Sequence, residues 1–282
     1  MDIGVVLMPS LTCSSDDLRT AGAAVERLGY HSVWVTEHVV VPVEIRSRYP
    51  YSADGRPAFA PDTPWSEAIV VLGLLAAVTD RIRLGTAVIP MTTRDPVSMA
   101  KQAATIDALS GGRLELGLGA GWMIEEAEVL GLPHDHRGAR LDEAIDLMRR
   151  AWTQPTFSHR GRFWDFPEVG VHPQPPQGAD LPIWIGGTSR AAVRTTLERA
   201  VGNVLWLAGP AEVADLRSRL GERRRVAVSM WLDFRGGGLA ARARALRDAG
   251  ADLLLLAAPR PVRATVADLE RFAGEVAPAL AK

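Results

Sequence analysis

Eight short apolar runs, each followed by a stretch with helical character, are distributed along the whole of this 282-residue chain. Their continuous Val, Ile and Leu content is typical of parallel strands that are covered on their outer face. Eight consecutive strand–helix units predict an α/β fold, a (β/α)8 TIM barrel, and such barrels commonly form one domain of about 250 residues. We therefore expect a single domain over residues 1–282. The runs are 3–8, 32–38, 82–90, 113–122, 181–187, 203–209, 226–234 and 251–259.

Two connections are longer than a barrel needs. One follows the second run and covers residues 39–62; the other lies between the fourth and fifth runs. We call these connections the first and second insertions. The second insertion, between the fourth and fifth runs, contains helical segments at 124–131 and 139–152. Its segment at 157–166 predicts a small hairpin. Long insertions after strands act as lids or pocket walls, and barrel active sites lie at the C-terminal ends of the strands. The functional residues are therefore expected at these strand ends and insertions.

The composition of the chain limits where in the cell the protein is expected and which partners it is expected to bind. The net charge of −1 offers no general attraction to nucleic acid or to a membrane surface, so neither is an expected partner. The one cysteine, Cys13, excludes an internal disulfide. No basic segment followed by an apolar one precedes the first apolar run, so no signal peptide is expected. The longest apolar stretch, 68–78, is too short to span a bilayer and predicts a barrel helix. A cytoplasmic protein is expected.

Helix starts are marked by residues that cap free backbone amides. Either Ser14 or Ser15 suits the N-cap position of the first helix, as do Thr63 before Pro64 and Asp95 before Pro96 for later helices.

His38 is the strongest catalytic candidate. It ends the second run, where side chains point into the barrel mouth, and an imidazole there can act as acid, base or hydrogen-bond donor. A histidine bonded to a backbone carbonyl is the structural alternative. The preceding Glu37 is expected to point away from His38, either orienting a ligand or pairing with an arginine.

Two glycine-rich strand ends suggest a bound ligand. In 184–193, Gly186 and Gly187 precede Thr188 and a helix start, which favours an anion; a capped tight turn is the alternative. In 117–122, the dinucleotide fingerprint is incomplete. That strand end predicts a slot for a flat ligand lined by Trp122, or glycines that only relieve crowding inside the barrel.

The sequence does not contain the residue patterns expected for metal binding or for hydrolysis by a serine nucleophile. No cluster of His, Cys or carboxylate has metal-ligand spacing, so no metal is expected, and no serine lies in a nucleophile elbow.

Five segments carry a resemblance to a known family: LGYHSVWVTEH, RIRLGTAVIP, DPVSMAKQAATIDALSGGRLELGLGAGW, RLDEAIDLMRRAW and PIWIGGTS. Together they resemble the luciferase-like monooxygenase superfamily, in particular the branch that uses the deazaflavin coenzyme F-420. The resemblance implies a barrel, commonly dimeric, that holds a deazaflavin or flavin at the strand ends. It implies an oxidoreductase that transfers hydride between F-420 and a small organic substrate, with a monooxygenase using reduced FMN as the alternative.

The resemblance also assigns roles. His38 matches a histidine that contacts the substrate, Ala87–Val88 falls at a bulge with a non-proline cis peptide, and Gly186–Thr188 match the turn that receives the cofactor phosphate. The residues expected to contact the cofactor are Met8, Glu37, Ala87, Val88, Gly119, Trp122, Gly186, Gly187 and Thr188.

Some residues differ from the pattern of the family, and these differences limit the class of substrate that is expected. Trp122 stands where related sugar-phosphate dehydrogenases carry a catalytic carboxylate, so a sugar phosphate is not expected. Tyr49, Tyr51 and Phe59 in the first insertion favour an apolar or aromatic ligand. Because the end of the sixth strand is unusual, a non-catalytic ligand-binding barrel is a further hypothesis. A lyase or isomerase is a last alternative. Such barrels normally carry a lysine or a metal cluster at the strand ends, and neither is seen in this sequence.

Overall fold

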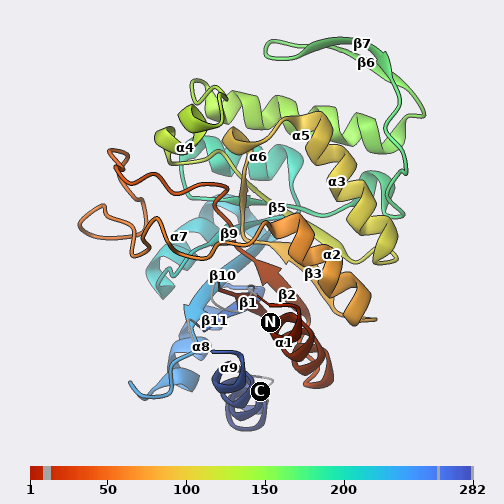
Figure 1. Ribbon diagram of the computed structural model, residues 1–282. Helices are drawn as coiled ribbons and strands as arrows, with labels where there is room; N and C mark the ends of the chain where they lie inside the picture. The colour runs from red at the N-terminus through yellow and green to blue at the C-terminus, as the bar shows by residue number, and fades with distance from the viewer. Residues whose placement is uncertain (9–13, 259–260, 281–282) are drawn as a thin grey trace.

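Eight parallel strands close into a barrel surrounded by helices (Figure 1). The computed structural model describes residues 1–8, 14–258 and 261–280, so Cys13 lies outside the described residues. The barrel closes where Leu84 pairs with Leu114. The predicted TIM barrel is confirmed. Its strands are β1 (Asp2–Leu7), β2 (Ser32–Val35), β3 (Arg83–Thr86), β5 (Leu114–Gly119), β8 (Ile183–Gly186), β9 (Gly202–Leu205), β10 (Arg225–Trp231) and β11 (Leu253–Ala258).

The helices follow the strands in the expected order. Within the described ranges, no helix has the length and apolar character that crossing a membrane requires. The main helices are α1 (Ser15–Arg27), α2 (Ala68–Val78), α3 (Pro96–Leu109), α4 (Ile124–Val129), α5 (Arg137–Thr153), α6 (Arg190–Arg199), α7 (Pro210–Leu220), α8 (Leu239–Asp248), α9 (Val262–Arg271) and α10 (Ala277–Leu280).

Two of the predicted helix starts are confirmed and one is wrong. The side chains of Ser14 and Asp95 accept hydrogen bonds from backbone amides three residues ahead, at 3.1 and 2.8 Å. Thr63 does not cap a helix, because α2 begins only at Ala68. There the Glu67 side chain accepts from the amide of Val70 at 2.6 Å.

The third apolar run is interrupted by a bulge. β3 ends at Thr86, and β4 (Ile89–Pro90) resumes pairing with the end of β5. The peptide bond between Ala87 and Val88 is cis, as the resemblance implied.

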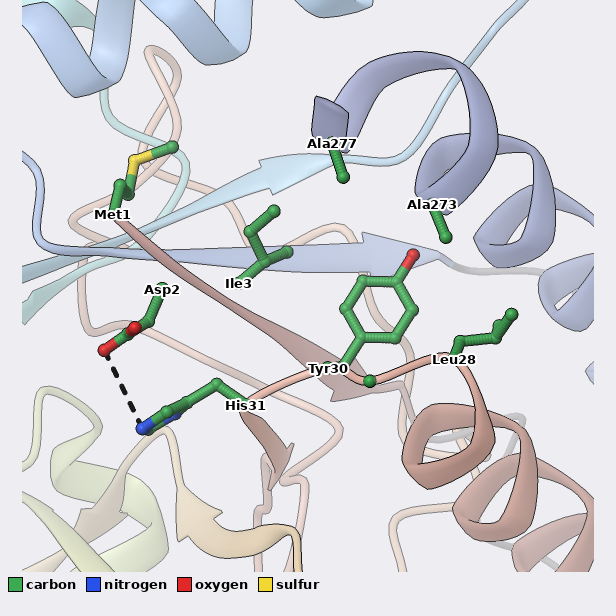
Figure 2. A pocket seen from close by; sticks show the side chains of 9 residues that line it. Met1, Asp2, Ile3, Leu28, Tyr30, His31, Ala273 and Ala277 are labelled. Carbon is green, nitrogen blue, oxygen red and sulfur yellow. Dashed lines mark ion pairs between the residues drawn. The ribbon is translucent and has the colours of Figure 1, made fainter. Parts of the chain in front are cut away.

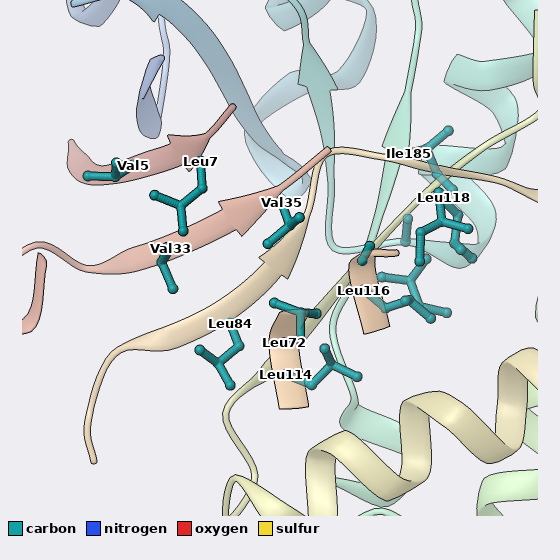
Figure 3. Packing of buried hydrophobic residues seen from close by; sticks show 14 of the residues in the cluster. Val5, Leu7, Val33, Val35, Leu72, Leu84, Leu114, Leu116, Leu118 and Ile185 are labelled. Atoms are coloured by element: carbon teal, nitrogen blue, oxygen red, sulfur yellow. The ribbon is translucent and has the colours of Figure 1, made fainter. Parts of the chain in front are cut away.

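The outward side chains of the strands form the main core. They alternate along each strand, as Val33 and Val35 do on β2, and pack against helix residues such as Leu72 of α2 (Figure 3). This packing holds the helices against the outer face of the barrel.

The barrel interior is filled by two indole rings. Trp34 and Trp184 meet edge to face with centroids 5.8 Å apart. Their N–H groups donate to Ser32 Oγ at 2.8 Å and to Glu115 Oε2 at 2.9 Å, so neither is left unpaired. Glycines provide the space: a Cβ at Gly85 would lie 2.3 Å from the Trp34 ring, and one at Gly202 would lie 2.6 Å from Trp184.

The two insertions are held together by α4. The Glu125 carboxylate accepts from the backbone amides of Arg46 and Ser47 at 2.9 and 3.0 Å, and Ser47 Oγ accepts from the amide of Ile124 at 3.0 Å. Further along the second insertion, β6 (Phe157–Arg160) and β7 (Asp165–Val169) form the expected hairpin, which extends beyond α5 (Figure 1). The α4 end of this insertion therefore lies against the first one.

Replacement of Gly117 by alanine is expected to destabilise the barrel. The new Cβ would lie 1.8 Å from the carbonyl oxygen of Thr86, so backbone must move. We expect Gly117→Ala to lower the free energy of unfolding by about 3 kcal/mol in a denaturant titration. Gly236→Ala is the matched control, because its Cβ meets no atom within 4 Å; it should change stability by less than about 0.5 kcal/mol. Equal effects of the two changes would contradict this account.

The Glu125 anchor is expected to weaken in acid. Burial raises its pKa, but hydrogen bonds from Ser47 and from backbone amides outweigh this and lower the pKa to about 2, from 4.5 ordinarily. Since the folded value is the lower one, the stabilisation is present above pH 4.5 and is lost as the pH falls toward 2. We expect Glu125→Gln to cost about 2 kcal/mol at neutral pH, and the difference from wild type to shrink between about pH 5 and pH 2.

Glu128→Gln is the control for this change. Glu128 is exposed and pairs only with Arg46 among the described residues, so its removal should cost less than about 0.5 kcal/mol. A Glu125→Gln deficit that stays constant with pH would contradict the proposed origin.

Candidate active site

His38 lies just beyond β2 inside an enclosure of aromatic rings. Its side chain is 9% exposed. Its ring centroid is 4.9 Å from that of Phe59, 5.1 Å from Trp65 and 5.9 Å from Trp122. The first two rings come from the connection between β2 and α2, and the third follows β5. The structure therefore brings together His38 and Trp122, both predicted from the sequence, and adds Trp65.

The imidazole of His38 is fixed by a carboxylate that the sequence did not reveal. Nδ1 of His38 lies 2.9 Å from Oε2 of Glu126 on α4. The other carboxylate oxygen accepts from the amides of Val39 at 2.7 Å and Val40 at 3.4 Å. The available signal was a pair of adjacent acidic residues shortly after a strand end, but it did not indicate which partner each would have.

Glu37 points away from His38, as expected. Its Oε2 accepts from the amide of Ala68 at 2.7 Å, and its Oε1 pairs with Arg94, which also pairs with Glu67. Burial raises the pKa of Glu37, and the Arg94 guanidinium opposes this. With its side chain 1% exposed, Glu37 joins β2 to α2, and this placement does not support its expected contact with a cofactor.

The floor of the barrel mouth is formed by the bulge after β3. Met8, Ala87 and Val88 are partly exposed and pack on the interior cluster that contains both indoles. A Cβ at either Gly119 or Gly186 would lie 2.9 Å from Val88 Cγ2. The absence of a side chain at both positions leaves room for Val88; for Gly119 this agrees with the alternative that glycines relieve crowding inside the barrel.

The turn after β8 is open at its tip. Gly187 has a φ of 98°, and a Cβ at this position would meet no atom within 4 Å, while Thr188 is exposed. The Ser189 side chain caps α6 by accepting from the amide of Ala192 at 3.1 Å. The remaining first-turn amides of α6 have no partner within the helix, an arrangement that suits an anion.

Aromatic residues continue the wall of the mouth away from His38. The Tyr49 ring lies 5.1 Å from Trp122 and 5.4 Å from Tyr51. Burial raises the pKa of the Tyr49 phenol to about 12, and the neighbouring Trp206 side chain opposes part of this rise. Trp206 in turn lies 6.1 Å from Trp231. Predicted loop aromatics and the unusual end of the sixth strand therefore meet.

Among the described residues, the buried polar atoms without a hydrogen-bond partner include Thr36 Oγ1, two residues before His38, and Nε1 of Trp65. A buried polar group left unpaired costs about 1–3 kcal/mol. The unpaired Nε1 of Trp65, whose ring packs against His38, suits a site that binds polar atoms of a ligand. No group of three or more potential metal ligands occurs in the part of the chain that the structure describes.

A separate pocket lies at the opposite end of the barrel. Figure 2 shows it at the start of β1, with Asp2 and His31 paired at 3.7 Å and Tyr30 near Ala273. In barrel enzymes this N-terminal face serves stability, whereas the C-terminal face carries the chemistry. The mouth around His38 is therefore the candidate active site.

The chain is similar in sequence to several known proteins. An uncharacterised protein of Mycobacterium tuberculosis is 36% identical over 193 residues, which are 68% of this chain and 65% of that protein. An F-420-dependent glucose-6-phosphate dehydrogenase of Amycolatopsis mediterranei is 31% identical over 61% of this chain and 48% of its own length. An FMNH2-dependent dimethylsulfone monooxygenase of Pseudomonas putida is 36% identical over 45% of this chain and 35% of its own. The matches thus span two thirds or less of each relative.

A solved structure shares the fold over nearly the full length. The monooxygenase RslO1 from Streptomyces bottropensis superposes with a TM-score of 0.79, covers 99% of both chains and is 18% identical in sequence. The family model for luciferase-like monooxygenases matches residues 1–230, which is most of the chain. This protein therefore belongs to the luciferase-like monooxygenase family.

Proposed function

We propose that this protein is an oxidoreductase that binds a deazaflavin of the F-420 type at the barrel mouth and exchanges hydride with a small organic substrate. The observation that carries the proposal is a nearly buried His38, enclosed by aromatic rings at the strand ends of a family whose members use such cofactors. The F-420-dependent relative supports deazaflavin, and its alignment covers more of this chain than that of the FMNH2-dependent relative.

The residues at the mouth fit a planar ring with an anionic tail. Val88 and Ala87 offer an apolar floor, and the open turn at Gly187–Thr188 offers amides at the start of α6. Such a cofactor, when bound, supplies the hydride chemistry, while the protein supplies position and electrostatics.

In this proposal, His38 contacts the substrate. With Nδ1 directed at Glu126, Nε2 is the nitrogen left to contact a substrate oxygen and to hold or accept its proton. The rings of Phe59, Trp65 and Trp122 exclude water around it and favour an apolar or aromatic substrate skeleton. The second candidate is a monooxygenase that uses reduced FMN, favoured by the Pseudomonas putida relative.

Cofactor binding distinguishes these candidates. We expect F-420 fluorescence to change saturably on titration with the purified protein, with a weaker response from FMN. Thr188→Glu places a negative charge at the proposed tail site and should weaken F-420 binding about tenfold or more, which is about 1.4 kcal/mol. Thr188→Val is the matched control, because it leaves the backbone amides unchanged. Binding of FMN alone would favour the monooxygenase, and binding of neither would refute the proposal.

Loss of the His38 imidazole should affect turnover more than cofactor binding. We expect His38→Ala to lower kcat by about 10²- to 10⁴-fold, the range for general acid–base catalysis, with the F-420 dissociation constant within about threefold of wild type. Turnover is followed by F-420 absorbance with neutral aromatic and aliphatic alcohols and ketones. His136→Ala, at an exposed histidine, is the control. Unchanged turnover in His38→Ala would remove His38 from the mechanism.

A further inference from the structure

The Glu126 carboxylate is surrounded by hydrogen-bond donors. Its side chain is 2% exposed, and its contacts are Nδ1 of His38 and the amides of Val39 and Val40. Within the described residues, it forms no ion pair with a lysine or arginine. A carboxylate can only accept hydrogen bonds, so each of these nitrogens carries the shared hydrogen.

This arrangement specifies one tautomer of His38. A neutral imidazole has one N–H, and donation from Nδ1 to Glu126 leaves the lone pair on Nε2. The other close neighbours of the ring are Phe59, Trp65 and Trp122, which offer no carboxylate or carbonyl oxygen from their side chains. Glu126 is therefore the contact that decides which nitrogen faces the ligand.

The same carboxylate ties the imidazole to the first insertion. Oε1 holds the backbone immediately after His38, and the neighbouring Glu125 holds Arg46 and Ser47. The segment 39–47, at the start of the first insertion, is thus held by two adjacent side chains of α4. It cannot leave α4 without breaking the hydrogen bonds to Glu126, and the orientation of His38 depends on that residue.

We propose that Glu126 is a positioning residue: one carboxylate oxygen holds His38 with Nδ1 protonated and Nε2 free toward the ligand, and the other holds the backbone at Val39, directly after the imidazole. The catalytic consequence rests on the proposed function. The tautomer itself is a property of the protein without any cofactor, so the two are tested separately.

The direct test is nitrogen NMR of the cofactor-free protein labelled with ¹⁵N-histidine, at a pH where the imidazole is neutral. The His38 signals are assigned by their absence in His38→Ala. In the wild type we expect a protonated Nδ1 and an unprotonated Nε2. In Glu126→Gln the amide both donates and accepts, so the population protonated at Nε2 should rise about fivefold or more. Glu125→Gln is the matched control, which loosens the same segment and should leave the tautomer unchanged.

Kinetics provide a second measurement. We expect Glu126→Gln to lower kcat about 10- to 100-fold, because the imidazole is no longer held, and Glu125→Gln to act mainly on KM.

A wild-type spectrum with Nε2 protonated would overturn the proposal, even if the Glu126 variant failed to fold. An unchanged tautomer in a folded Glu126→Gln protein would overturn it as well. The expected tautomers in a protein that binds neither F-420 nor FMN would support the positioning role and refute the proposed function alone.

Discussion

The filling of the barrel interior is the constraint on which the rest of the structure depends. Trp34 and Trp184 occupy the space inside the strands, and Gly85 and Gly202 are needed because any side chain there would meet an indole. The interior below the mouth is thereby occupied by protein. Val88, resting on Gly119 and Gly186, forms the next layer. A ligand can therefore be accommodated only above this layer, where His38 lies.

The upper boundary of the site depends on a second contact, between the two long insertions. Adjacent carboxylates on a helix point in directions about 100° apart, so Glu125 and Glu126 reach different parts of the segment after β2. One holds the amides of Arg46 and Ser47, and the other holds His38 and Val39. The short helix α4 thus fixes both the enclosure and the imidazole within it, which links ligand access to the chemical group.

Features governed by local sequence were predicted well. All eight strands lie within or beside the apolar runs, because period and length of such runs reflect burial directly. Caps at Ser14 and Asp95 also follow from neighbouring residues. The prediction of a cap at Thr63 was wrong because a Thr–Pro pair has the local chemistry of a helix start. The actual cap of α2 is Glu67, which pairs with the buried Arg94.

The sequence by itself determined the barrel, the position of His38 at a strand end, and the opposite directions of Glu37 and His38, since these depend on strand order and alternation. Only the tertiary structure decided that Glu126 holds His38 and that Arg94 holds Glu37. These partners are 88 and 57 residues apart in the chain. Insertions have no periodicity that would specify a register, so the contacts of their side chains are settled only when the closed barrel brings the strand ends together.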